Sequence, residues 1–195
     1  MILTELTAVP AASLPFYSLK EHLRLGTGFA EEDLQDGLLE TVMRAAISAL
    51  EARLGVVLLS KQFSWQLTAW RNSDRQILPK RPVQNLESVV LIDASDQETI
   101  IDLSEFVLSK DTQNPSVAPH GCFPVIPTGG FAEIRFAAGF GENWADIPAD
   151  LAQAMILLAS HFYENRNGTQ VTEVQFPPLV VSLIGPYQRI RGLRG

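Results

Sequence analysis

AEEDLQDGLLETVMRAAISALEARLG, residues 30–55, is the stretch that decides the fold. Acidic residues at positions 31–33 stand in the first turn of a possible helix, where they favour the helix dipole, and Gly55 ends the run. Small and apolar side chains recur with a period of about 3.6 residues, which is typical of an amphipathic helix. They lie on or beside one face, at Leu34, Leu38, Val42, Ala45, Ala46, Ala49, Leu50 and Leu54. We expect a long helix whose alanines allow a second helix to pack closely.

A second helix is predicted over residues 148–165. Asp146 is placed to cap it, and Pro148 is tolerated in a first helical turn. Its apolar residues again follow the helical period, at Leu151, Met155, Leu158 and Phe162. The polar run Asn165–Gly168 then breaks the pattern.

The region between the two helices has a different pattern. Phe63, Trp65 and Leu67 alternate with polar residues, which predicts a strand with one face open to solvent. Further short β-prone runs, LESVVLID, ETIIDL, FVLS and AEIRFAAGF, are separated by Asp, Asn, Pro and Gly. The predicted fold class is α+β: a small helical bundle of two long and several short helices, with an inserted, mostly antiparallel β unit.

The predicted organisation has three parts. Residues 1–16 are expected to be an extended N-terminal arm, because Pro10 and Pro15 would interrupt a helix there. Residues 17–166 form the main domain, with the β unit at about 56–140. Residues 167–195 form a flexible C-terminal arm that begins with the polar stretch TQVTEVQ.

Charge and composition limit the classes of function. The net charge is −7, which disfavours non-specific binding to nucleic acid. Residues 166–195 hold four arginines against one glutamate, a net charge of +3, so the first 165 residues carry −10. The single cysteine, Cys122, excludes a disulfide within the chain. We expect neither a secretory signal nor a membrane-spanning segment, because no apolar run is long enough.

The C-terminal run PYQRIRGLRG, residues 186–195, is a candidate interaction site. Tyrosine and arginine are enriched in the energetically important parts of protein interfaces. The candidate residues are Tyr187, Arg189, Ile190, Arg191 and Arg194. Three arginines beside an acidic body make a weak footprint for nucleic acid, so a protein partner is the better expectation.

HFYENRNG, residues 161–168, is the candidate for catalysis. His161 and Glu164 are three residues apart on a helix and would form the acid–base pair of a small hydrolase or transferase. No nucleophile, metal-binding spacing or phosphate-binding loop accompanies them, so we expect no cofactor and no metal. The structural end of a helix is the favoured interpretation.

The order of these pieces resembles the tailed-phage head–tail connector (adaptor) family, which includes the adaptors of gene transfer agents. The resemblance extends over about residues 17–191. It is carried by SLKEHLRL, the long helix at 30–55, ILPKRPVQNLESVVLID, AEIRFAAGFGENWADIPADLAQAMILLASHFYENRNG and PPLVVSLIGPYQRIR.

The resemblance implies a structural protein without enzymatic activity. Its members form a homo-oligomeric ring, usually twelve-fold, at the head–tail junction of the particle, after assembly in the bacterial cytoplasm. The resemblance implies three partners: the portal protein, held by the C-terminal segment; stopper or tail proteins on the opposite side; and DNA that passes through the channel without sequence-specific binding. A membrane is not among them. Another ring component, a stopper or a tail terminator, is the structural alternative, but the two long helices argue against it.

Overall fold

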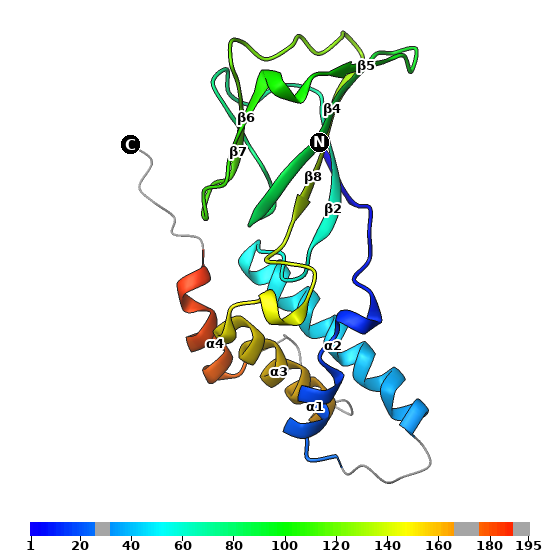
Figure 1. Cartoon of the computed structure of the whole chain (residues 1–195), viewed down its shortest axis with the longest axis vertical. Helices are drawn as coiled ribbons and strands as arrows, with labels where there is room; N and C mark the ends of the chain where they lie inside the picture. Colours follow the sequence, from blue (N-terminus) through cyan, green and yellow to red (C-terminus); the bar gives the residue numbers. More distant parts are fainter. Residues whose placement is uncertain (26–31, 166–175, 189–195) are drawn as a thin grey trace. The chain divides into compact units, whose positions relative to one another are not determined.

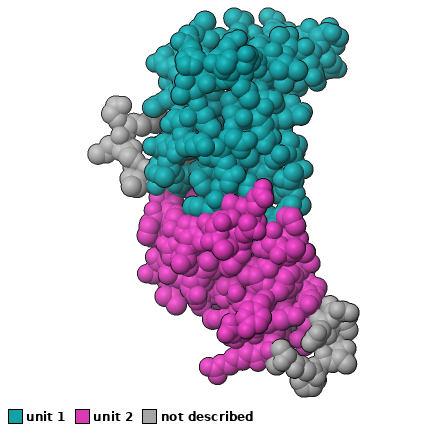
Figure 2. All heavy atoms as spheres, in the orientation of Figure 1, with its two compact units in different colours: residues 1–9, 59–140 teal, residues 10–58, 141–195 magenta. Residues whose placement is uncertain are grey.

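A computed structural model describes residues 1–25, 32–165 and 176–188 of the chain. The chain divides into two compact units, which interleave along the sequence (Figure 2). Unit 1 comprises Met1–Val9 and Leu59–Phe140, and unit 2 comprises Pro10–Leu58 and Gly141–Gly195. The first unit is built of strands and the second of helices, which confirms the predicted α+β class (Figure 1).

Unit 1 contains two antiparallel sheets. The larger has the strand order β1-β2-β8-β4-β5, and its strands are β1 (Ile2–Glu5), β2 (Lys61–Leu67), β4 (Val83–Ile92), β5 (Glu98–Ile101) and β8 (Phe131–Ala138). The smaller has the order β3-β7-β6, formed by β3 (Gln76–Ile77), β6 (Phe106–Ser109) and β7 (Ser116–Pro119). A short 3-10 helix, η2 (Leu103–Glu105), joins β5 to β6. The predicted β unit at 56–140 therefore holds every described strand except β1.

The N-terminal residues have a more specific role than that of an arm. Residues 2–5 are extended, as expected, but they form an edge strand that pairs along β2, with Leu3 opposite Trp65. The segment after it continues through a 3-10 helix, η1 (Ala11–Ser13), into the helical unit. Strand β1 is thus separated by more than fifty residues from the rest of its sheet.

The core of unit 1 lies on the face of the larger sheet that carries its aromatic residues. Phe63 and Phe136 stack with ring centroids 5.6 Å apart, and Phe136 is fully buried. Trp70 and Phe123 stack at 4.3 Å beside Phe106 of the smaller sheet. Burial of such aromatic side chains contributes strongly to the stability of a small β unit.

The expectation that β2 has one solvent-exposed face is wrong for Ser64. This residue is buried, and its hydroxyl donates a 2.6 Å hydrogen bond to the buried carboxylate of Glu133 on β8. Glu133 also forms an ion pair of 3.0 Å with Arg135. Each of these polar groups has a hydrogen-bond or ion-pair partner, which allows polar side chains to be buried. The alternation of polar and apolar residues does not distinguish a buried polar face from a solvent-exposed one.

Unit 2 is centred on α3 (Ala149–Glu164), which packs against the other three helices (Figure 1). These are α1 (Phe16–His22), α2 (Glu32–Leu54) and α4 (Pro178–Ile184). The facing side chains are fully buried and include Leu19, Met43, Leu50, Leu151, Met155 and Val180. The two long helices predicted from periodicity are therefore α2 and α3. Among the described residues, no helix has both the length and the apolar character needed to cross a membrane.

The start of α3 differs from the prediction. Its N-cap is Pro148, and Asp146 belongs to a preceding 3-10 helix, η3 (Trp144–Asp146). The Asp146 carboxylate accepts a 2.9 Å hydrogen bond from the backbone N–H of Asn143. Asp146 therefore stabilises the turn before α3 rather than α3 itself.

Candidate assembly surfaces

The end of the described chain is held on the helical unit by α4. This short helix begins at Pro178, buries Val180 and Ile184, and packs against α3. A 3-10 turn, η4 (Gly185–Tyr187), follows directly, and Gln188 N–H bonds back to the carbonyl of Gly185. The buried side of α4 thus fixes where the C-terminal residues leave the unit.

Tyr187, the last residue of η4, is hydrogen-bonded to α3. Its hydroxyl donates a 2.8 Å hydrogen bond to Oδ1 of Asp150, in the first turn of α3. Burial, and then the hydrogen bond to Asp150 and the charge of that carboxylate, raise the pKa of Tyr187 to about 12. The phenol therefore stays protonated at neutral pH and remains a donor to Asp150.

The structure places one of the five predicted interaction residues. Tyr187 is half-buried and bonded to Asp150, so it anchors the segment rather than standing free. The other four, Arg189, Ile190, Arg191 and Arg194, lie outside the described residues. The polar stretch predicted to be flexible, at 167–176, also lies outside them except for Phe176. The interaction set stays a prediction.

Helix α4 exposes two apolar side chains, one on each side of its buried residues. Leu179 is 58% exposed and Val181 is also exposed, next to the buried Val180. The run PPLVVSLI contained the signal, because it has more apolar residues than a seven-residue helix can bury on one side.

The candidate catalytic residues do not form a site in the structure. The side chain of Asn165 contacts His161. Its nitrogen lies 3.1 Å from Nδ1 of the His161 ring and donates a 2.8 Å hydrogen bond to the backbone carbonyl of His161. Glu164 is exposed at the end of α3. These contacts finish the last turn of the helix. In the described ranges, no cluster of His, Cys, Asp or Glu is suited to hold a metal ion.

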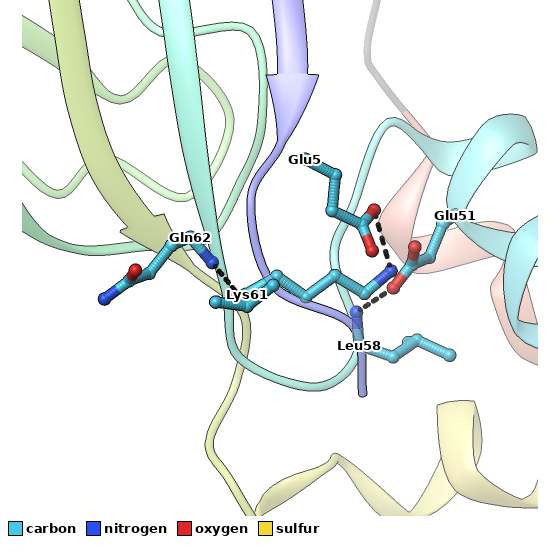
Figure 3. A network of polar contacts seen from close by, with 6 residues as sticks. Glu5, Glu51, Leu58, Lys61 and Gln62 are labelled. Atoms are coloured by element: carbon cyan, nitrogen blue, oxygen red, sulfur yellow. Dashed lines mark hydrogen bonds and ion pairs between the residues drawn. The ribbon is translucent and has the colours of Figure 1, made fainter. Parts of the chain in front are cut away.

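Polar contacts attach the N-terminal strand to its sheet (Figure 3). Lys61 reaches Glu5 with an ion pair of 3.2 Å, and the backbone N–H of Gln62 donates to the Thr7 hydroxyl at 2.9 Å. Lys61 is almost fully buried, so its charge needs the Glu5 carboxylate. β1 is therefore a fixed part of unit 1.

A separate contact organises the end of α2 in unit 2. The buried carboxylate of Glu51 accepts a 2.9 Å hydrogen bond from the backbone N–H of Leu58, and both groups are drawn in Figure 3. Gly55, with φ of 66°, makes the turn between them. The bond fixes the chain direction after α2.

Comparison with solved structures finds full-length relatives. A chain in the neck of an empty gene transfer agent (GTA) particle, computed with sixfold symmetry, is 42% identical, with a TM-score of 0.90. A chain in the virion of a native GTA particle is also 42% identical, with a TM-score of 0.86. A chain in the native GTA neck, computed with twelvefold symmetry, is 38% identical, with a TM-score of 0.85. Each alignment covers 100% of this chain and 99% of the other.

No protein-family profile matches the chain, and no curated protein does either. The solved relatives nevertheless define the class, because all three are structural chains of phage-like particles. The chain belongs to the family of gene transfer agent neck proteins. This membership confirms the predicted location at the head–tail junction of a phage-like particle.

Proposed function

We propose that the protein is the adaptor of the neck, a ring subunit that joins the portal of the head to the tail. The observation that carries this proposal is the full-length likeness to a GTA neck chain, at 42% identity and a TM-score of 0.90. The helical unit supports an adaptor over a stopper or a tail terminator, since those are usually dominated by strands. Identity over the whole length also supports a role in structure rather than catalysis.

The proposed assembly is a homo-oligomeric ring, twelve-fold when complete. Its support is the sixfold and twelvefold symmetry with which the relatives' necks were computed. A closed ring of identical copies uses one heterologous contact repeated around the axis. DNA passes through the centre in this proposal. A net charge of −7 suits a conduit, because an acidic wall repels phosphates and does not retain them.

The portal is the proposed partner of the C-terminal segment. Arg189, Arg191 and Arg194 follow the anchor at Tyr187 within seven residues. Arginines in a short segment suit an acidic protein surface, where they contribute to the rate and specificity of association. The Tyr187–Asp150 bond supports this role, because it holds the base of the segment on a packed helix.

Removing residues 189–195 is expected to abolish binding to the portal and leave the chain folded. The cut falls after η4, so α4 and the Tyr187–Asp150 bond stay intact. The measurement is the recovery of tailed particles when the truncated chain is supplied to cells that lack the full-length one, with binding to purified portal as the second readout. We expect a fall of at least about a hundredfold in affinity, equivalent to about 2.7 kcal/mol.

Two control variants separate charge from anchoring. Replacing Arg189, Arg191 and Arg194 together with glutamine keeps the length of the segment and should reproduce the loss. Tyr187→Phe removes only the hydroxyl that bonds Asp150 and should leave most of the binding. Head–tail joining at the normal level by the truncated chain would refute the assignment of the portal to this segment.

A further inference from the structure

The two edge strands of the larger sheet expose aliphatic side chains. Within the described part of unit 1, β1 and β5 each have one neighbouring strand, and they lie at opposite ends of the order β1-β2-β8-β4-β5. Soluble proteins protect such edges with short strands, charged side chains (especially lysine), proline or a bulge, because unpaired backbone groups attract other strands. The strand sequences ILTE and ETII are four residues long and contain one glutamate each, but neither lysine nor proline. Neither lysine nor proline therefore prevents a partner strand from pairing with these edges.

The register of the sheet shows which residues would meet a partner. Within the described sheet, two rows of paired residues run all the way from β1 to β5. One begins at Leu3 and ends at Ile101, through Trp65, Ile134 and Val89. The other begins at Ile2 and ends at Ile100, through Gln66, Glu133 and Val90. Each complete row starts and finishes with an aliphatic side chain.

The second row ends in two strongly exposed side chains. Ile2 is 60% exposed and Ile100 is 75% exposed, and they lie on the same face of the sheet because one row contains both. The glutamates of the two edge strands lie on opposite sides of these two rows. Glu5 lies on β1 beyond the Leu3 row and forms an ion pair with Lys61, whereas Glu98 lies on β5 beyond the Ile2 row, opposite Ile92.

We propose that β1 of one copy lies against β5 of the next copy in the ring, with Ile2 beside Ile100 and Leu3 beside Ile101. The inference rests on the proposed ring, because the occupant of each edge is a second copy of this chain. A ring with rotational symmetry needs two different patches on opposite sides of the subunit. The two edges of one sheet meet that requirement, and each presents unpaired backbone N–H and C=O groups that can bond to the other. The contact extends the sheet from one subunit to its neighbour.

Disulfide trapping tests the contact directly. The background variant is Cys122→Ser, because Cys122 is exposed. Ile2→Cys and Ile100→Cys are combined in that background, and particles carrying the chain are oxidised. Neighbouring residues on adjacent strands have Cβ atoms about 5 Å apart, close enough for a disulfide after small shifts. We expect covalent multimers longer than dimers, and their return to monomers on reduction.

The matched control combines Ile2→Cys with Val125→Cys. Val125 is 86% exposed but lies outside the strands of unit 1, so this pair should stay monomeric. Multimers from the Ile2/Ile100 pair alone would support the contact. Monomers from that pair, in particles that contain the chain, would overturn the inference and leave the proposed function standing. Absence of the wild-type chain from purified particles would overturn the proposed function and the inference together.

Lysine substitutions provide a second measurement that does not depend on oxidation. Ile2→Lys and Ile100→Lys place a charge on each edge, and we expect each to lower the number of chains per particle at least about tenfold. Val125→Lys makes the same chemical change outside the strands and should leave that number unchanged. Circular dichroism of each variant checks the fold, which side chains this exposed should not disturb. Normal incorporation of both edge variants would contradict the proposal.

Discussion

Gly139→Ala should destabilise the protein by about 3 kcal/mol, because a side chain at this position is disfavoured twice. Gly139 has a φ of 139°, a conformation that residues with a Cβ rarely adopt. An added Cβ would also lie 2.6 Å from the backbone nitrogen and Cα of Ser60, so the chain must shift. The Gly139 N–H donates to the carbonyl of Pro82 at 2.9 Å, which limits such a shift.

Thermal unfolding followed by circular dichroism measures this effect. A loss of about 3 kcal/mol corresponds to a fall in Tm of roughly 6–12 °C for a chain of this size. Gly121→Ala is the matched control, because a Cβ there meets no atom within 4 Å. Equal Tm values for the two variants would show that the close approach of Gly139 to Ser60 is not present in solution.

Phe136→Ala should cost about 3–5 kcal/mol, the usual range for removing a buried phenylalanine. Phe136 is fully buried on β8 and stacks on Phe63, with the two rings inclined at 22°. Its removal leaves a cavity beside the aromatic core of unit 1 and forfeits the stacking contact. The same central strand pairs with both β2 and β4, so loss of its anchor weakens both sides of the sheet.

Urea unfolding monitored by tryptophan fluorescence follows this loss, since Trp65 lies on the strand paired with β8. Phe131→Ala serves as the control: it makes the same substitution on the same strand, at a residue that is only half-buried. We expect a clearly smaller loss there. A Phe136→Ala midpoint no lower than that of the control would place the core of unit 1 elsewhere.

Periodicity predicted the helical part of the fold well. The stretches at 30–55 and 148–165 contain α2 and α3, because many residues contribute to one helical pattern. The predicted start of the first helix, at residues 30 and 31, lies outside the described residues. Phe162, the last residue of the predicted apolar stripe, is only half-buried, since it lies in the last turn of α3. The residues that start a helix were harder to identify, as Asp146 shows.

Strand β1 could not be predicted as part of the sheet. ILTE is four residues long and is followed by Pro10 and Pro15, and its partner strand begins at Lys61. Pairing over such a separation depends on the tertiary fold and leaves no local signal. The same reason applies to Tyr187, whose type indicated an interface but whose partner, Asp150, lies 37 residues away.

The central claim is that this chain joins the head of the particle to its tail. The resemblance of its ordered motifs and the full-length likeness to GTA neck chains support it independently of any single residue. Electron microscopy of particles from cells that lack only this chain tests it most directly. We predict heads without tails and free tails, with tailed particles restored when the wild-type chain is supplied. Intact tailed particles with a complete neck in the absence of the chain would contradict the account.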